Sequence, residues 1–214
     1  AQTAQECADI ALAAKKKGVS VLVCHVLRYT PFFNRVKEII MEGKLGDIVS
    51  VLHVEAVGNV HQSHSYVRGN WHCEAETTPM LLAKSCHDLD ILLWLTGSHC
   101  TKVAAFGNLS YFRKENAPAG SSDRCLNCPL ADHCRFDARR VYLPTLGAWP
   151  TEVVCLEQTE EALLEALKTS PYGRCVFRCD NNVVDNQIVN MQFEGDTIAQ
   201  LKSIAFTNDL QRLI

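Results

Sequence analysis

Residues Thr78–Gly97, which read TPMLLAKSCHDLDILLWLTG, contain the clearest helix signal in the chain. A threonine cap followed by proline at the first helical position predicts the start, and Gly97 predicts the end, so we expect one helix over Met80–Leu95. Spacings of three and four residues place a polar set on one face, namely Lys84, His87 and Asp88, together with Ile91. The other face is predicted to pack on the core through Leu82, Cys86, Leu89 and Leu93.

The segments on either side of this helix mix strand and helix patterns irregularly. Helices are predicted over Gln2–Lys17, Phe32–Glu42 and Thr159–Lys168. Strands are predicted over Val19–Val26, Ile48–Val57 and Val103–Phe106, and as a hairpin over Val183–Phe193 and Thr197–Phe206. Polar loops are expected over Gly58–Ala75 and Arg113–Pro129. Because the elements are mixed and the hairpin is antiparallel, the sequence predicts an α+β fold, with a sheet that carries helices on one face.

The composition of the 214 residues is that of an ordinary globular protein. The chain is 47% hydrophobic and has 21 Lys and Arg residues against 24 Asp and Glu residues. This apolar content argues against disorder, and the nearly balanced charge argues against a nucleic-acid partner. No apolar run is long enough to predict a membrane span. The eleven glycines form neither G-x-G-x-x-G nor G-x-x-x-x-G-K, so no cofactor-binding residues are predicted for a dinucleotide or nucleotide phosphate.

Cysteine is unusually frequent, with eleven residues in the chain. Since the count is odd and several cysteines lie in apolar or helical patterns, we expect a reduced, cytoplasmic chain. Cys125, Cys128 and Cys134 have the spacing C-x-x-C-x5-C, which makes a structural zinc site a candidate. A fourth ligand would be His133, which adjoins Cys134, or one of three later cysteines if the fold brings it near, namely Cys155, Cys175 or Cys179. The alternative is a set of reduced cysteines in a loop.

The polar face of the central helix suggests proton transfer, because imidazole is the side chain that titrates near neutral pH. In this interpretation His87 exchanges the proton and Lys84 polarises a developing oxyanion, while Asp88 or Asp90 orients the ring. The alternative is an exposed helix face with ordinary ion pairs between successive turns. Several other residues are typical of the lining of a polar small-molecule pocket: Arg28, Tyr29, Arg68 and Trp71.

Three stretches are together similar to a known family in their order and spacing. They are Val21–Pro31 (VLVCHVLRYTP), Val36–Val49 (VKEIIMEGKLGDIV) and Cys86–Gly97 (CHDLDILLWLTG). The chain resembles the Gfo/Idh/MocA family, which comprises NAD(P)-dependent oxidoreductases of sugars and cyclitols. The resemblance implies a Rossmann domain followed by an open-faced, largely antiparallel β-sheet domain with the substrate contacts. Residues 1–27 resemble the last helix and strand of the first domain and residues 28–214 resemble the second, so most of the Rossmann domain is expected to be missing.

The resemblance also implies roles for individual residues. His87 matches the histidine taken as the acid/base beside the substrate hydroxyl. Many members have an aspartate four residues earlier, where this sequence has Ala83, and Lys84 is the candidate substitute. The predicted substrate-binding residues are Arg28 and Tyr29, which match a pair at the domain boundary, Arg68 and Trp71, which match the substrate loop of some members, and Asp88.

Two functions from different classes follow from these patterns. The first is the substrate-binding portion of an oxidoreductase that acts on a hydroxyl of a sugar, cyclitol or related small molecule, with NAD or NADP in the parent enzyme and no activity of this portion alone. The second is a non-catalytic domain of the same fold that binds a ligand or forms a homo-oligomer through the open sheet face. A weaker third candidate is an interaction module stapled by zinc.

Overall fold

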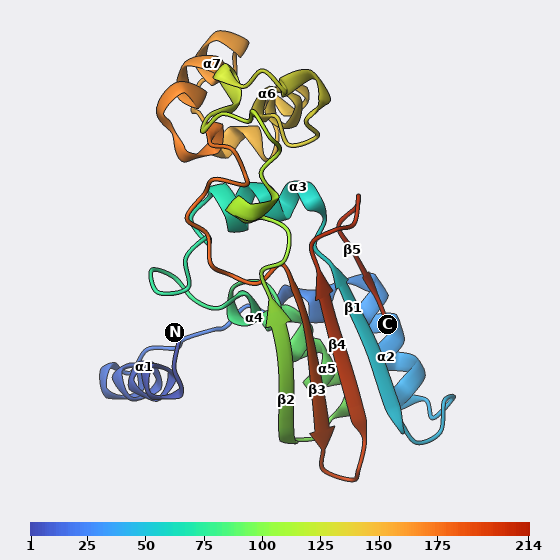
Figure 1. Cartoon of the computed structure of the whole chain (residues 1–214). Helices are drawn as coiled ribbons and strands as arrows, with labels where there is room; N and C mark the ends of the chain where they lie inside the picture. Colours follow the sequence, from blue (N-terminus) through green and yellow to red (C-terminus); the bar gives the residue numbers. More distant parts are fainter.

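A five-stranded sheet forms the centre of the computed structural model, which describes residues 1–214 (Figure 1). In chain order the strands are β1 (Ser50–Ala56), β2 (Cys100–Asn108), β3 (Asn186–Phe193), β4 (Ile198–Ile204) and β5 (Gln211–Leu213). Across the sheet their order is β2-β3-β4-β1-β5. β1 runs parallel to β4, and every other neighbouring pair is antiparallel. The predicted α+β class with an open, largely antiparallel sheet is confirmed.

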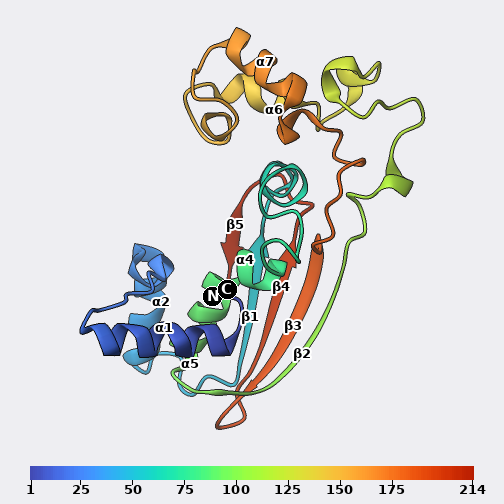
Figure 2. The same cartoon turned by 90° about the vertical axis from the view of Figure 1, so that its left-hand side faces the viewer.

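Helices α2 (Pro31–Met41) and α5 (Cys86–Thr96) cover one face of the sheet, whereas the opposite face is bare (Figure 2). The β3–β4 hairpin packs toward α5 because its inward residues alternate along each strand. These residues form one apolar cluster with Leu92 of α5: Val189, Met191, Phe193, Ala199 and Leu201. Their burial specifies the strand register, since a slip by one residue would turn the whole set toward the bare face.

The helix predicted over Met80–Leu95 is divided in two. α4 covers Met80–Ala83 and α5 begins at Cys86, with Lys84 and Ser85 between them. Lys84 has φ −115° and Ser85 has φ −84° with ψ 4°, so neither continues a regular α-helix. The buried Ser85 hydroxyl accepts a hydrogen bond from Gln187 Nε2 of β3 at 3.4 Å. The expectation of one continuous helix is therefore wrong, because a tertiary contact at the break competes with the local pattern.

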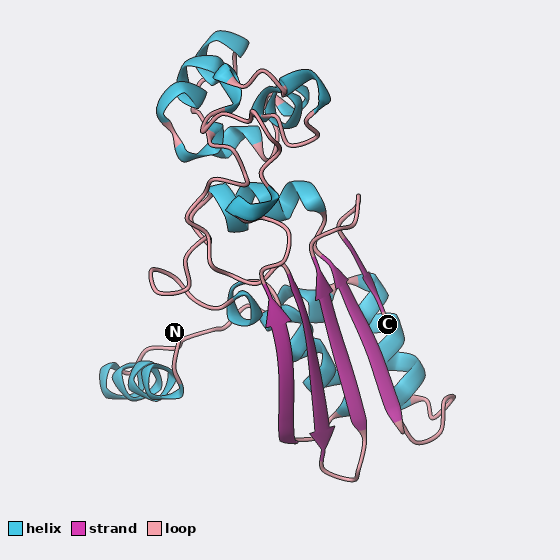
Figure 3. Cartoon of the chain, viewed as in Figure 1, coloured by secondary structure: helices cyan, strands magenta, loops and turns pink.

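Residues 109–185, between β2 and β3, form a lobe of short helices beyond one end of the sheet (Figure 3). This helical lobe contains α6 (Ala138–Tyr142) and α7 (Glu160–Thr169). Seven buried residues, including Tyr142 and Leu163, form a core cluster in it. Thr159 caps α7 as predicted, since its hydroxyl oxygen accepts a hydrogen bond from the Ala162 N–H at 3.3 Å.

The segment predicted as a polar loop over Gly58–Ala75 is largely helical. α3 (Asn59–His61) leads directly into a π-helical turn over Gln62–Arg68. Such turns are rare and often lie at functional sites. Gly69 follows the turn, and a Cβ there would lie 2.6 Å from the His64 carbonyl oxygen, so only glycine fits this close approach.

α1 (Ala4–Lys17) lies apart from the sheet and has no buried residue. Thr3 and Glu6 form a reciprocal cap at its start, and Gly18 ends it in the left-handed region with φ 64°. α1 has 14 residues, and no helix of the chain combines the length and the apolar content that crossing a membrane requires.

Val19–Val26, which the sequence predicts as a buried strand, pairs with no other strand in this structure. Leu22 is 86% exposed and Val23 is 70% exposed. The prediction is not met because a strand needs a neighbour to pair its N–H and C=O groups. A short 3₁₀ turn over Val26–Tyr29 instead leads the chain into α2.

Candidate active site

Five polar side chains form a continuous row between the sheet and α5. His53 and Glu55 project from β1, Arg212 projects from β5, and Lys84 and Asp88 come from the α4–α5 region. Lys84 Nζ lies 3.3 Å from Glu55 Oε1, and Arg212 Nε lies 2.9 Å from Glu55 Oε2. Arg212 Nε also donates a hydrogen bond to Asp88 Oδ1 at 2.7 Å, and His53 Nε2 lies 2.8 Å from the same oxygen. We refer to these five residues as the buried ionic row.

The buried ionic row contains two carboxylates that solvent does not reach, Glu55 and Asp88. Burial and the charge of Asp88 raise the pKa of Glu55, and Arg212 and Lys84 oppose this shift. Burial alone would also raise the pKa of Asp88, but the hydrogen bonds from His53 and Arg212 outweigh it and lower that pKa. As the pH falls, Glu55 therefore takes up a proton before Asp88 does.

His87 lies in the first turn of α5, beside the buried ionic row. Its ring meets the ring of His25 edge-on, with the centroids 5.8 Å apart. The buried Nδ1 atom of His87 has no hydrogen-bond partner. Burial, followed by the charges of His25 and Arg212, lowers the pKa of His87, so the imidazole is neutral at pH 7. A neutral imidazole with a free nitrogen can accept a proton from a hydroxyl placed within hydrogen-bond reach.

Arg28 and Asp90 hold the segment before α2 against α5. Arg28 donates from Nε and Nη2 to the two Asp90 oxygens at 2.7 and 2.5 Å. This bidentate geometry is a strong form of Arg–carboxylate pairing. Tyr29 is 76% exposed, and together with His25 and Arg28 it lines a hollow of about 200 Å³. His25 thus connects this hollow to the imidazole of His87.

Part of the chain that forms this arrangement matches a known family model. Residues 33–128 match the family model described as the GFO/IDH/MocA C-terminal domain. The matched range includes β1, α5 and four of the five members of the buried ionic row. Residues 33–128 are therefore similar to a GFO/IDH/MocA C-terminal domain.

Similar proteins occur among curated sequences and solved structures. A Bacillus subtilis (strain 168) protein described as an oxidoreductase, YteT, is 26% identical over 200 residues, which are 92% of this chain and 46% of the relative. A structure from Sinorhizobium meliloti 1021, described as a myo-inositol dehydrogenase, has a TM-score of 0.55 at 12% identity, covering 98% of this chain and 43% of that chain. A super-repressor mutant of Gal80p from Saccharomyces cerevisiae has a TM-score of 0.55 at 17% identity, covering 95% and 40%. The two structures share the fold, and the chain spans less than half the length of each of these three proteins.

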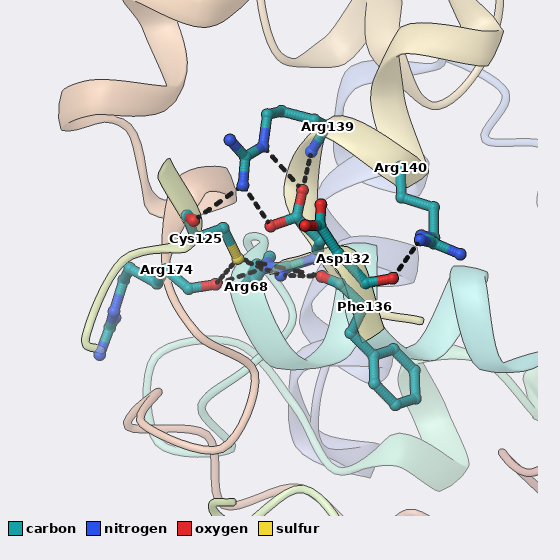
Figure 4. Close-up of polar contacts among 8 residues, drawn as sticks. Arg68, Cys125, Asp132, Phe136, Arg139, Arg140 and Arg174 are labelled. Carbon is teal, nitrogen blue, oxygen red and sulfur yellow. Dashed lines mark hydrogen bonds and ion pairs between the residues drawn. The ribbon is translucent and has the colours of Figure 1, made fainter. Parts of the chain in front are cut away.

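Arg68, a predicted substrate-binding residue, is almost fully buried, with only 2% of it exposed. Its Nε donates to the Arg174 carbonyl oxygen at 2.8 Å, and its Nη2 donates to the Phe136 carbonyl oxygen at 2.7 Å (Figure 4). The same Nη2 lies 3.3 Å from Cys125 Sγ. The expectation that Arg68 contacts substrate is not met, and the side chain instead ties the π-helical turn to the helical lobe.

Asp88 is also placed differently from the expectation that it binds substrate. It is fully buried between His53 and Arg212, so it orders the sheet against α5 rather than facing a pocket. Trp71, by contrast, is 43% exposed. Of the predicted residues, Lys84, His87, Arg28, Tyr29 and Trp71 keep side chains at least partly accessible.

The zinc site predicted at Cys125, Cys128 and Cys134 is not formed in the structure. No three His, Cys, Asp or Glu side chains lie close enough together to hold a metal ion, and all eleven cysteines are free thiols. Cys125 is buried against Arg68 and the carbonyl oxygen of Phe136. Burial raises the pKa of the Cys125 thiol, and the Arg68 guanidinium opposes this shift. The structure therefore supports the alternative, in which Cys125 packs as a small core residue.

Sequence reasoning missed three members of the buried ionic row, His53, Glu55 and Arg212. A usable signal was present in β1, because His53 and Glu55 stand two residues apart and therefore share one face of the strand. That face turns out to be the buried one. Two ionisable residues on a buried strand face require partners, which points to a polar site beneath α5.

His64 is a second buried histidine, and it lies where the π-helical turn meets the helical lobe. Its ring stacks on Tyr172 with the centroids 4.8 Å apart, and its Nδ1 lies 3.1 Å from the Tyr142 hydroxyl. Burial, aided by the charge of Arg68, lowers the pKa of His64 to about 4.

Mild acid is expected to destabilise the chain through His64. The unfolded chain binds a proton there below about pH 6.5, whereas the folded chain binds it only near pH 4, so the free energy of unfolding falls as the pH drops through this window. The full loss is about 3 kcal/mol, reached below pH 4. Urea unfolding from pH 7 to pH 4 should show a flatter pH dependence for His64→Gln than for the wild type, whereas the exposed His99→Gln should change nothing. Equal slopes for the wild type and His64→Gln would contradict this account.

Proposed function

We propose that the chain supplies the substrate-binding part of an NAD(P)-dependent oxidoreductase that acts on a hydroxyl group of a sugar, cyclitol or related small molecule. The domain match and the oxidoreductase description of the Bacillus subtilis relative support this class of reaction. The observation that carries the proposal is the neutral imidazole of His87, which has an unpartnered nitrogen and stands three residues after the cationic Lys84.

These two side chains supply complementary parts of an alcohol oxidation. His87 accepts the hydroxyl proton when the alcohol is oxidised and returns it in the reverse direction. Lys84 stabilises the negative charge that develops on the oxygen as the proton leaves. The accessible side chains of Arg28, Tyr29 and Trp71 are proposed to contact further polar groups of the substrate.

The residues of this chain do not by themselves fit a dinucleotide. The pyrophosphate of NAD or NADP is held where a G-x-G-x-x-G turn joins a strand to a helix, and the sequence has no such spacing. Gly58 does stand between β1 and α3, but a Cβ there would lie 3.4 Å from the backbone of Asp209, so this turn is covered. We therefore propose that this chain binds the alcohol and exchanges the proton of its hydroxyl group. NAD or NADP is proposed to bind elsewhere in a cytoplasmic parent enzyme. In that enzyme residues 1–27 belong to the nucleotide domain and residues 28–214 belong to the substrate domain.

The proposal is tested by assaying the full-length protein against a panel of sugars, cyclitols and sugar acids, while the absorbance of reduced nicotinamide is followed. Oxidation of at least one of these classes with NAD or NADP is expected, and simple primary alcohols serve as the negative set. A folded protein that reduces neither cofactor with any polyol would contradict the proposal.

The bare face of the sheet favours a second function, self-association. Exposed apolar side chains on this face include Leu52, Phe106 and Ile198, of which Leu52 is 60% and Phe106 is 78% exposed. A hollow of about 690 Å³ lies across the strands and is lined by residues of β1, β2, β3 and β4. An apolar area of this kind is typical of a surface that another protein covers. We propose that a second copy of the chain covers it.

Phe106→Asp is expected to turn an oligomer into a monomer, because Phe106 pairs with Ile188 on this face and the substitution places a charge there. Val153→Asp is the matched control, since Val153 is an exposed valine on the helical lobe. Light scattering after size-exclusion chromatography measures the mass of each variant. An unchanged mass for Phe106→Asp would rule the bare face out as the contact.

A further inference from the structure

We propose that Glu55 is a positioning residue that holds the ammonium group of Lys84 beside His87. This inference rests on the proposed oxidoreductase function, in which Lys84 stabilises charge on the substrate oxygen. It adds a residue from β1, far from His87 in the sequence, to a pair that the sequence places on one helix.

The break between α4 and α5 leaves Lys84 without a helical framework. α4 ends at Ala83 and α5 begins at Cys86, so the regular three-residue spacing that would align Lys84 with His87 does not apply. Lysine has a long side chain with many rotamers, and ordering it requires a partner. Glu55 is the one carboxylate that forms an ion pair with Lys84, at 3.3 Å.

Glu55 is itself held firmly, so it can act as a fixed point. It is fully buried, and it stands directly opposite Arg212 in the antiparallel β1–β5 pair. Its Oε2 atom lies 2.9 Å from Arg212 Nε, while its Oε1 atom faces Lys84. Each oxygen therefore faces one cation in an ion pair, although neither forms a hydrogen bond.

The charges of the buried ionic row balance only when Glu55 is included. Two carboxylates, Glu55 and Asp88, then face two cations, Lys84 and Arg212, and His53 Nε2 lies against Asp88. Without Glu55, the row would hold two cations and one carboxylate, and Lys84 would have no ion-pair partner. The Lys84 side chain is only 11% exposed, so water would replace the lost partner poorly, and the protonated amine would be less favoured.

The test measures the reactivity of the Lys84 amine in the full-length protein. Acetylation by an N-hydroxysuccinimide ester at mildly alkaline pH requires the neutral amine and can be followed at each lysine by mass spectrometry. Glu55→Gln keeps the shape of the side chain but removes its charge, so Lys84 should be acetylated about tenfold faster than in the wild type. Glu165→Gln is the matched control, because it removes the carboxylate from the exposed Lys168–Glu165 pair and should leave Lys84 unchanged.

A second variant keeps the test decisive if Glu55→Gln does not fold. Glu55→Asp keeps the charge and withdraws it by one methylene, so it should give an acetylation rate between those of the wild type and Glu55→Gln. An unchanged Lys84 rate in a folded Glu55→Gln or Glu55→Asp protein would overturn the proposal. In the active enzyme Glu55→Gln should also lower kcat about tenfold with little change in KM, which a merely structural residue would not do. If His87→Ala left activity intact, the proposed function would fail, yet the acetylation rates would still decide the role of Glu55.

Discussion

Replacing His87 by alanine is expected to lower kcat/KM of the full-length enzyme by about 10²–10⁴-fold, the range typical of losing a positioned general base. The loss should appear mainly in kcat, because the imidazole acts on the proton that leaves in the transition state. Steady-state rates with the polyol that the wild type oxidises best provide the measurement. Cofactor affinity should be nearly unchanged, since no residue of α5 is assigned to the dinucleotide.

The matched control is His99→Ala. His99 follows α5 at its opposite end and is exposed, so its removal should leave kcat/KM at the wild-type value. Equal activity of His87→Ala and the wild type would remove His87 from the mechanism. A shared loss in both variants would show that the substitutions lower activity through the fold rather than through the chemistry.

Replacing Arg68 by methionine is expected to cost about 3–5 kcal/mol of unfolding free energy, because a buried polar network loses its central donor. Methionine fills similar space but leaves the carbonyl oxygens of Phe136 and Arg174 without the hydrogen bonds that Arg68 gives them. The helical lobe should loosen first, since these two carbonyls belong to it. Urea unfolding followed by tryptophan fluorescence measures the change, and Trp149 lies in the lobe itself.

Two further arginine variants separate this effect from a general loss of charge. Arg135→Met removes an exposed arginine of the same lobe and should cost less than about 0.5 kcal/mol. Arg68→Lys keeps the charge but lacks the planar fork, so a single ammonium cannot reach both carbonyls as Arg68 does. Its stability should lie between those of the wild type and Arg68→Met. If Arg68→Met proved as stable as Arg135→Met, Arg68 would not link the turn to the lobe.

Local signals in the sequence were sufficient for elements whose ends have clear chemistry. The Thr30-Pro31 and Thr159 caps locate α2 and α7, and alternation around Gly195 locates the β3–β4 hairpin. The same reasoning failed for Val19–Val26, because an apolar run forms a strand only where a neighbouring strand receives it. It failed again at Ser85, where a partner on a distant strand decides how the helix divides.

Some residues of the candidate site could likewise be found from the sequence, and others could not. His87 and Lys84 could be found from sequence, since they stand three residues apart in a segment with strong helix signals. Glu55 and Arg212 could not be paired, because 157 residues separate them and only the β1–β5 register brings them together. The burial of Arg68 could not be predicted either. Its hydrogen bonds go to backbone carbonyl oxygens, and every residue type has such an oxygen.

The parallel pairing of β1 with β4 has a consequence for how the molecule is made. Ser50 of β1 pairs with Ile198 of β4. β1 is synthesised early, and it can pair with β4 only after nearly the whole chain has been made. Until β4 and β5 leave the ribosome, β1 has no neighbouring strand, and Glu55 and Asp88 lack their shared partner Arg212. Contacts this distant along the chain form slowly, because a long loop must close before any of them stabilises the fold. The order of synthesis therefore makes the electrostatic centre of the candidate site the last part of the sheet to assemble.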